Sequence, residues 1–224
     1  MNNSTTLNLN AWSIVFAFLF FQATGWAQMM RNPSLGIAFS ENLGQHPDQV
    51  LYSTNFAAGQ IFVEKGGLTF SLYDKERVQE IHDNHLDILE NQVDRDSYRM
   101  VLVNSQEPAH AGRKQQPWHT NHYLGDDRSK WVSNARVFDQ VDLQEIYPGI
   151  DLEFLGEYNN FKYNVKVAAG ADLDLMRWSY EGVKSLNVEN GELQVETEVG
   201  IIHEMKPLAW QIDAEGGREL VSCN

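Results

Sequence analysis

Short apolar segments separated by turn signals dominate the second half of the chain, from Asn121 onward. The turn signals recur about every 8 to 12 residues and include Glu189-Asn190-Gly191 and Glu198-Val199-Gly200. This spacing is typical of antiparallel strands joined by tight turns, because a crossover between parallel strands needs a dozen or more residues. The expected strands are Val141–Ile146, Ile150–Leu155, Phe161–Val167, Met176–Tyr180, Ser185–Val188, Leu193–Thr197, Ile201–Glu204 and Ala209–Ile212.

The first half of the chain adds one hairpin and one helix to this pattern. Residues 60–64 and 68–73 are short strands, and Lys65-Gly66-Gly67 between them supplies the glycines that a hairpin turn favours. Asp74 can cap a helix, and apolar residues then recur at three- and four-residue spacing, which predicts an amphipathic helix over 74–92. We expect 98–103 to return to strand and the polar stretch 104–117, with two prolines, to be a surface loop.

These elements predict an all-β or β-dominated fold, an antiparallel β-sandwich-like module with one short helical excursion at about 74–92. The chain contains neither the dinucleotide-binding nor the P-loop glycine pattern. It also shows no internal repeat with a period of about 20 to 50 residues, so a repeat array is excluded.

The N-terminal 27 residues have the features of an export signal. They contain no Asp, Glu, Lys or Arg, and an apolar run from Ala11 to Phe21 ends in a stretch with Gly25 and Ala27. That run is too short for a membrane span, which needs roughly 20 residues. We predict a secretory signal peptide over 1–27, cleaved between Ala27 and Gln28. Its n-region lacks the usual basic residue, so an uncleaved anchor and a buried N-terminal helix are the alternatives.

Charge and cysteine content limit the partners of the remaining module, 28–224. The chain has 31 acidic and 17 basic residues, a formal net charge of −14, and all of it lies after the predicted signal. A nucleic-acid partner is not expected, because binding to phosphates depends on clustered Lys and Arg. The single cysteine, Cys223, allows neither an internal disulfide nor a cysteine-based zinc site.

An ordered set of short motifs resembles a known family. The motifs are Glu41-Asn-Leu-Gly-Gln45, Asn121-His-Tyr-Leu-Gly-Asp126, Ser129-Lys-Trp131, Ile146-Tyr-Pro-Gly-Ile-Asp-Leu152, Phe161-Lys-Tyr163, Tyr180-Glu-Gly182 and Glu204-Met-Lys-Pro207. In this order they resemble the N-terminal domain of unknown function of large exported bacterial proteins. Such proteins commonly continue into SBBP-type β-propeller repeats, and many end in a gliding-motility-associated, type IX secretion sorting domain.

The resemblance covers roughly residues 38–222 and brings no agreed catalytic residues with it. It implies that the chain is the front module of a longer cell-surface protein, truncated near Cys223, with an unfinished edge strand at 218–221. A genuine stand-alone module is the alternative interpretation.

Candidate metal ligands are weakly indicated. His82 and His85 share a helical spacing, and His119 and His122 repeat it in the following loop, but this spacing alone is common. Oxygen ligands for a structural calcium ion are available at turns, and Asp126 with Asp127 is the best pair. The other oxygen pairs are Asp151 with Glu153 and Asp172 with Asp174. Aspartate is also frequent in turns for purely local reasons, and no EF-hand pattern is present. We therefore predict no obligatory cofactor and keep structural calcium as an alternative.

Aromatic residues in a loop-rich stretch give the strongest indication of a binding site, although large aromatic residues such as Trp131 also commonly have a structural role. Trp118, Tyr123 and Trp131 lie in or beside a loop-rich stretch, where their faces can stack on sugar rings or on a protein partner. Trp178 and Trp210 follow strand periodicity and are expected in the core. Other motif residues have backbone explanations: Gly149 is expected in a left-handed turn, and Asn42 and Gln45 to hydrogen-bond neighbouring loops.

No catalytic constellation is recognisable, because the chain lacks a Gly-x-Ser-x-Gly elbow and its cysteine lies at the terminus. We predict a non-enzymatic module of a secreted or cell-surface protein that acts in surface assembly, adhesion or extracellular binding. Its partner would be an extracellular protein or glycan, and only the export signal would engage a membrane. A carbohydrate-binding or carbohydrate-processing module and a metal-dependent enzyme are the two alternatives.

Overall fold

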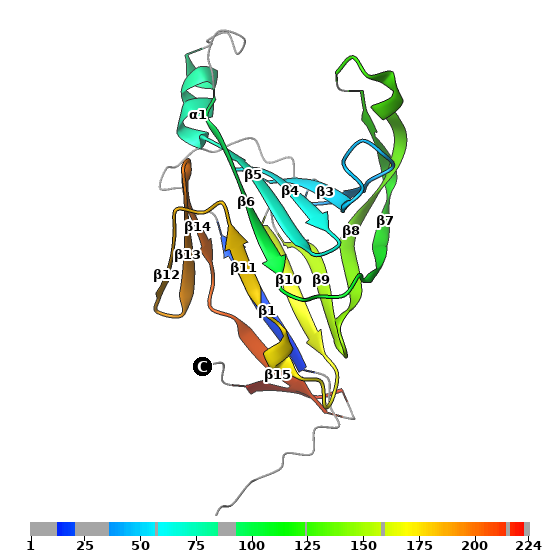
Figure 1. Cartoon of the computed structure of the whole chain (residues 1–224), viewed down its shortest axis with the longest axis vertical. Helices are drawn as coiled ribbons and strands as arrows, with labels where there is room; N and C mark the ends of the chain where they lie inside the picture. The colour runs from blue at the N-terminus through cyan, green and yellow to red at the C-terminus, as the bar shows by residue number, and fades with distance from the viewer. Residues whose placement is uncertain are drawn as a thin grey trace, which may run out of the picture.

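The computed structural model is built almost entirely from antiparallel β-strands, as the turn spacing predicted (Figure 1). It describes residues 13–20, 36–56, 58–84, 93–123, 125–157, 160–213 and 216–221. The strands of the first half are β1 (Ser13–Phe20), β2 (Phe39–Glu41), β3 (Val50–Phe56), β4 (Gly59–Glu64), β5 (Gly67–Tyr73), β6 (Arg95–Leu102) and β7 (Ala109–His122). Those of the second half are β8 (Val132–Tyr147), β9 (Ile150–Glu157), β10 (Asn160–Val167), β11 (Trp178–Glu181), β12 (Ser185–Glu189), β13 (Glu192–Thr197), β14 (Gly200–Glu204), β15 (Leu208–Ile212) and β16 (Arg218–Val221).

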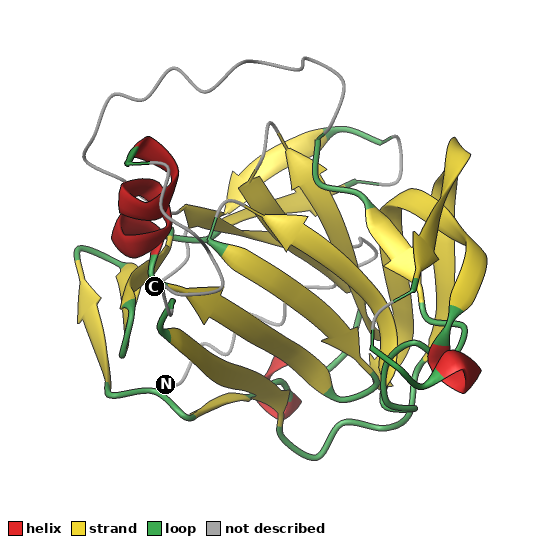
Figure 2. Ribbon diagram, turned by 90° about the horizontal axis from the view of Figure 1, so that it is seen from above, coloured by secondary structure: helices red, strands yellow, loops and turns green. Residues whose placement is uncertain are grey.

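The strands join in one continuous, strongly curled path. Its order is β11-β6-β5-β4-β3-β2-β8-β9-β10-β1, and from β1 it continues to β14-β13-β12 and, separately, to β15-β16. Seen from above, the main sheet bends so that its two halves face each other (Figure 2). The predicted sandwich-like arrangement is therefore reached by curling a single sheet.

Aromatic side chains fill the space between the two halves. Phe70 of β5 meets Phe161 of β10 edge to face, with ring centroids 6.3 Å apart, and Phe161 also contacts Phe39 and Phe154. Phe39, Phe70 and Phe154 are fully buried. Burial of each such ring stabilises the fold by about 1.5–3 kcal/mol relative to leaving it in water. This aromatic core holds the curled sheet closed.

The β4–β5 hairpin has the predicted register and turn. Glu64 pairs with Gly67, and the strictly alternating residues of β5 place Leu68, Phe70 and Leu72 on the buried face. A Cβ atom on Gly67 would lie 2.0 Å from the carbonyl oxygen of Met100, so only glycine lets β6 approach here.

The turn between β8 and β9 also follows the prediction, since Gly149 adopts a φ of 72°. This left-handed conformation favours glycine and reverses the chain directly after Pro148. All eight strands expected in the second half are found with their ends within two residues of the predicted ones, except that the first of them extends much further toward the N-terminus as β8.

The predicted helix is present in the described residues. α1 (Lys75–Asp83) begins directly after Asp74, whose carboxylate accepts a hydrogen bond from the Arg77 amide at 3.0 Å, as expected for an N-cap. Ile81 is buried, whereas Val78 is 37% exposed, so the predicted apolar stripe is only partly covered. Residues 85–92 of the predicted helix, including His85, lie outside the described residues.

The predicted surface loop over 104–117 is wrong for most of its length, because β7 begins at Ala109. β7 pairs with β8, and most of its residues are exposed on both faces. Without one buried face, β7 has no apolar alternation, which is the signal that identifies a strand in sequence. The register of β7 shifts between Gln115 and His119, around Pro117, where the ladder cannot continue regularly.

The apolar run assigned to the export signal forms β1 in the full chain. β1 pairs antiparallel with β10 on one side and with β15 and the end of β14 on the other. The predicted cleavage residues Ala27 and Gln28 lie outside the described residues. None of the helices in the described parts of the chain is long and apolar enough to cross a membrane.

Candidate binding surface

The β7–β8 hairpin extends away from the curled sheet and carries the residues predicted to bind a ligand. Figure 1 shows it rising on the right of the molecule, opposite α1. At its tip, the 3-10 turn η1 (Arg128–Lys130) connects the two strands. The hairpin therefore presents its tip to solvent, away from the aromatic core.

Local hydrogen bonds fix the conformation of the tip. The Trp131 indole Nε1 donates to the carbonyl oxygen of Gly125 at 3.1 Å. The Asp127 carboxylate caps η1 by accepting from the backbone N and the hydroxyl of Ser129, at 3.0 and 2.6 Å. These hydrogen bonds lower the pKa of Asp127. Gly125, Ser129 and Trp131 of the sequence motifs thus form a hydrogen-bonded turn with Asp127, so a structural role alone explains these motif residues.

The structure brings Tyr123 and Trp131 together on this tip. Their ring centroids are 5.7 Å apart with an interplanar angle of 60°, and the Arg128 guanidinium lies 5.2 Å from the centre of the Trp131 ring. Tyr123 is 53% exposed and Trp131 is 38% exposed. Two aromatic faces and one cation are therefore held in contact with each other and with solvent.

Trp118, the third predicted residue, lies further down β7 and is 40% exposed. No ring contact joins Trp118 to the tip pair among the described residues. Large aromatic side chains that stay exposed on a defined surface are characteristic of recognition sites, since Trp, Tyr and Arg dominate the energetics of interfaces.

The predicted calcium ligands are used in other ways. Asp127 caps η1, and Asp126 beside it is exposed. Asp151 accepts from the Glu145 backbone N at 2.7 Å, and Glu153 pairs with Lys166 at 2.6 Å. Within the described parts of the chain, no group of three His, Cys, Asp or Glu side chains is placed to hold a metal ion. The predicted His82–His85 pair lies outside the side chains that are described.

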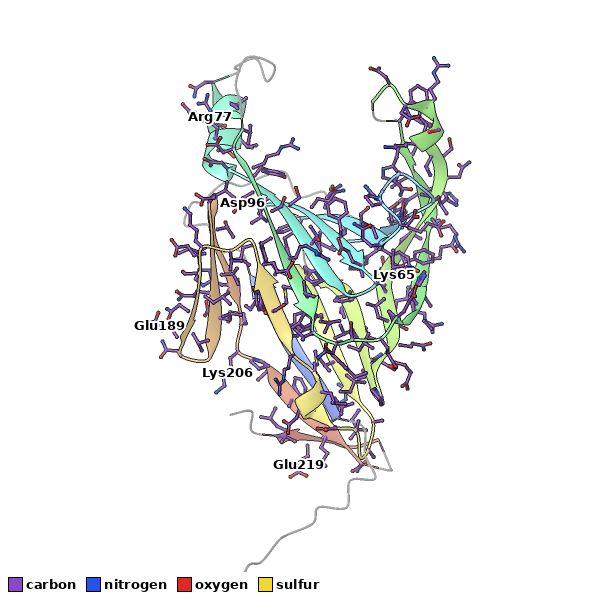
Figure 3. All side chains as sticks on the ribbon, in the orientation of Figure 1. Lys65, Arg77, Asp96, Glu189, Lys206 and Glu219 are labelled. Atoms are coloured by element: carbon purple, nitrogen blue, oxygen red, sulfur yellow. The ribbon has the colours of Figure 1, made fainter. Side chains whose placement is uncertain are left out.

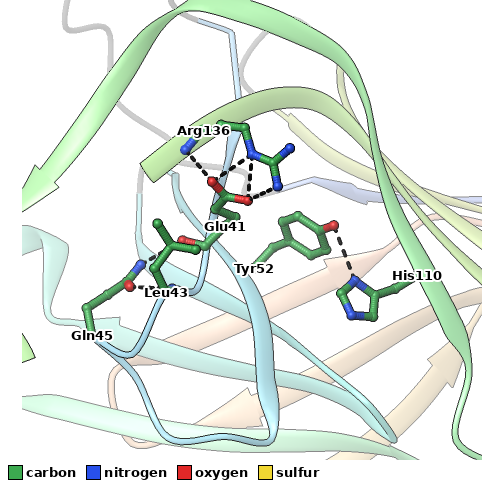
Figure 4. A network of polar contacts seen from close by, with 6 residues as sticks. All are labelled: Glu41, Leu43, Gln45, Tyr52, His110 and Arg136. Atoms are coloured by element: carbon green, nitrogen blue, oxygen red, sulfur yellow. Dashed lines mark hydrogen bonds and ion pairs between the residues drawn. The ribbon is translucent and has the colours of Figure 1, made fainter. Parts of the chain in front are cut away.

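A polar network joins the base of the hairpin to the first strands (Figure 4). The Glu41 carboxylate accepts from the backbone N of Arg136 at 2.8 Å and from the guanidinium Nε and Nη2 at 2.9 and 2.6 Å. Burial raises the pKa of Glu41, but these bonds and the positive charge outweigh it and leave the pKa lowered. Beside this pair, the Tyr52 hydroxyl and His110 Nδ1 are 3.3 Å apart.

The Asn42–Gln45 cluster closes the loop between β2 and β3 through bonds within residues 41–50, not to neighbouring loops as predicted. The Asn42 amide donates to the Val50 carbonyl oxygen at 2.8 Å. The Gln45 amide donates to the Glu41 carbonyl oxygen at 2.7 Å (Figure 4). Together with the Glu41–Arg136 pair, this loop fixes β2 to β8. Hydrogen bonds between β2 and β8 therefore fix the part of the β7–β8 hairpin that adjoins the sheet.

Two histidines lie side by side on the opposite face of these strands. The rings of His46 and His122 are 6.0 Å apart, and their Nε2 atoms are 3.2 Å from the Ser53 hydroxyl and 3.4 Å from the Ser40 hydroxyl. Burial lowers the pKa of both histidines, and each is therefore mainly neutral at pH 7. Neutral rings bonded to hydroxyls fit a structural role on this face.

One polar centre was missed by sequence reasoning. Glu204 of β14 is buried, and the hydroxyls of Tyr163 and Tyr180 donate to its carboxylate from β10 and β11. Trp178, expected in the core, is only partly buried and packs against Tyr163 at the edge of this centre. The three polar residues all fall in motifs, but nothing in the sequence indicates that these motifs meet.

Comparison with known proteins identifies a family but no function. A family model described as a domain of unknown function (DUF7948) matches residues 39–224. Comparisons with curated proteins and with solved structures give no match.

Proposed function

We propose that this chain, which belongs to the DUF7948 family of domains of unknown function, is a non-catalytic binding module of a secreted or cell-surface bacterial protein. In this proposal the tip of the β7–β8 hairpin contacts an extracellular protein or glycan. One observation carries it: Tyr123, Trp131 and Arg128 are held together in an exposed, hydrogen-bonded turn. Residues of these types supply most of the affinity in protein interfaces.

The predicted export signal over 1–27 also supports a location outside the cell. The resemblance to the front modules of SBBP-repeat and gliding-motility-associated, type IX-secreted proteins points to the same location. N-terminal sequencing of the protein recovered from the cell exterior tests this part. A chain that begins at Gln28 is the expected result, and a chain that retains Met1 inside the cell contradicts it.

A carbohydrate ligand is the specific alternative that the tip favours, because aromatic faces stack on sugar rings. A glycan array probed with the fluorescently labelled chain separates the two classes of partner. If the module binds glycans, saturable binding to a defined set of sugars is expected, and Trp131→Ala reduces it at least tenfold.

Two further variants make this experiment specific. Tyr123→Ala removes the second ring of the pair, and Trp118→Ala removes an exposed tryptophan outside it. Val188→Ala on β12 is the matched control, because Val188 is an exposed apolar residue, 69% accessible, on a different part of the molecule. Equal loss of binding in Val188→Ala and Trp131→Ala would contradict a specific role for the tip.

A further inference from the structure

A pocket with a buried carboxyl group lies on the side of the molecule away from the hairpin. Its volume is about 320 Å³, and it is open to solvent and lined by β10, the segment from η2 (Leu173–Leu175) to β11, and the β13–β14 pair with the residues that follow β14. Met176, Trp178, Leu193 and Met205 form apolar walls. The volume lies at the small end of the range for ligand sites. It corresponds to roughly ten water-sized groups.

Glu204 is the one carboxyl group among the described residues that line this pocket. Glu204 is only 6% exposed. The Tyr180 hydroxyl donates to its Oε1 atom at 2.6 Å, and the Tyr163 hydroxyl lies 3.4 Å from its Oε2 atom. Burial raises the pKa of Glu204 to about 7, although both phenol hydrogen bonds act to lower it. The carboxylate is therefore poorly compensated, and a positive charge beside it would stabilise the ionised form.

The aromatic residues around Glu204 are also suited to a cation. Tyr163 and Trp178 both line the pocket, with ring centroids 5.9 Å apart and an interplanar angle of 63°. The faces of such rings attract ammonium groups, and the attraction grows when water is excluded. An apolar wall, two aromatic rings and one buried carboxylate together complement an ammonium group attached to an apolar body.

We propose that this pocket binds an organic monocation, with its ammonium group beside Glu204 and its apolar part against Trp178, Met176 and Leu193. This site is separate from the hairpin tip and is a feature of the full chain, in which β1 pairs with both β10 and β14. The ligand class follows from the pocket chemistry alone: one positive charge, an apolar body and about ten non-hydrogen atoms.

The other ionisable groups around the pocket restrict the ligand to a single charge. Tyr98 faces the Glu204 centre from β6, and its buried hydroxyl has no hydrogen-bond partner among the residues that the structure describes. Next to Glu204 on β14, His203 is already paired with Glu192 of β13. Lys206 passes its alkyl chain over Gly191 and is exposed at the rim, on the segment that leads from β14 to β15 (Figure 3). A second positive charge on the ligand would be repelled there.

Calorimetric titration of the full chain with 2-phenylethylammonium chloride tests the proposal, with 2-phenylethanol as the neutral molecule of the same shape. At pH 8 we expect saturable binding of the ammonium ion and at least tenfold weaker binding of the alcohol. Between pH 6 and pH 8 the affinity for the ammonium ion should rise about tenfold, because Glu204 loses its proton across this range.

Three variants assign the effect to Glu204. Glu204→Gln should abolish the preference for the ammonium ion over the alcohol, while Glu192→Gln, which changes a neighbouring carboxyl group outside the pocket lining, should retain it. Tyr180→Phe removes a hydrogen bond that lowers the pKa of Glu204, so the midpoint of the pH profile should move upward. If Glu204→Gln fails to fold, the pH midpoint of Tyr180→Phe still tests whether Glu204 binds the ammonium group.

Three results would each overturn the proposal. The first is the absence of saturable binding of 2-phenylethylammonium to the folded chain. The second is an ammonium preference that persists in folded Glu204→Gln. The third is a pH midpoint that stays in place in Tyr180→Phe.

Discussion

Arg136 stabilises the fold mainly by compensating the buried Glu41 carboxylate, and its removal provides a residue-level test. In Arg136→Ala, the guanidinium bonds are lost and only the backbone N remains as a donor. We expect the free energy of unfolding at pH 7 to fall by about 1–3 kcal/mol, because a buried charge loses its main partner. Chemical denaturation measures this change.

The pH dependence of the Arg136→Ala effect follows from the lowered pKa of Glu41. A carboxyl group with a lowered pKa in the folded state contributes stability at neutral pH and loses it as the pH falls through that pKa. The difference between Arg136→Ala and the original protein should therefore shrink toward pH 3. Lys184→Ala, which breaks an exposed pair with Glu198, is the control and should leave the free energy of unfolding nearly unchanged. An equal cost in both variants would contradict this account of Glu41.

Glu204 affects stability with the opposite sign. Its pKa is raised from an ordinary 4.5 to about 7 in the folded chain, so the unfolded chain loses this proton first as the pH rises. The contribution of Glu204 to stability is therefore complete below about pH 4.5 and is lost between there and about pH 7. The loss amounts to a few kcal/mol, since each pKa unit corresponds to about 1.4 kcal/mol.

Glu204→Gln should remove this pH dependence, because the amide does not ionise. We expect the variant to gain stability relative to the original chain on going from pH 5 to pH 8, as measured by urea denaturation. Comparison with the original chain is needed because burial lowers the pKa of His46, His110 and His122, which makes the fold less stable as the pH falls below about 6.5. A difference between the two proteins that stays constant with pH would contradict the raised pKa of Glu204.

At the level of elements, the position of β1 gives cleavage of the predicted export signal a structural consequence. β1 occupies the place between β10 and β15, with six residue pairs to β10 and four to β15. Cleavage after Ala27 would leave the facing backbone groups of both strands without these partners. Hydrogen exchange should therefore be faster at β10 and β15 amides in residues 28–224 than in the full chain, while β4 and β5 amides should be unchanged. Equal protection of β10 in both forms would contradict the pairing.

Strand positions could be predicted well from sequence wherever one face is buried and a turn residue ends the strand. β5, β9, β10, β13 and β14 meet both conditions, and Gly149 even adopts the predicted left-handed conformation. β7 meets neither, because it stands away from the core and exposes both faces. Its strand character comes from pairing with β8, a tertiary contact that leaves no periodic signal.

The two candidate sites also differ in how far the sequence could predict them. Tyr123 and Trp131 are eight positions apart across one turn, so their proximity could be inferred from local sequence. Glu204 and Tyr180 come from β14 and β11, and Tyr163 comes from β10. Only the order of strands in the curled path brings these together, and that order is not encoded in any local pattern.

For the whole molecule, the curled sheet supports two separate features, the tip of the β7–β8 hairpin and the pocket at Glu204. The aromatic core closes the sheet, the Glu41–Arg136 pair fixes the base of the hairpin, and the exposed tip lies beyond both. The net charge of −14 disfavours anionic partners. The binding surface is consequently expected at the tip rather than over the acidic body.

Site-specific photo-crosslinking in cells that produce the protein tests this central claim most directly. Benzoylphenylalanine introduced at position 123 places a reactive group at the tip, and the same residue at position 188 is the control on β12. We predict a discrete crosslinked product from position 123 and none from position 188. The absence of any product from position 123, or equal products from both positions, would contradict the assignment of the hairpin tip as the binding surface.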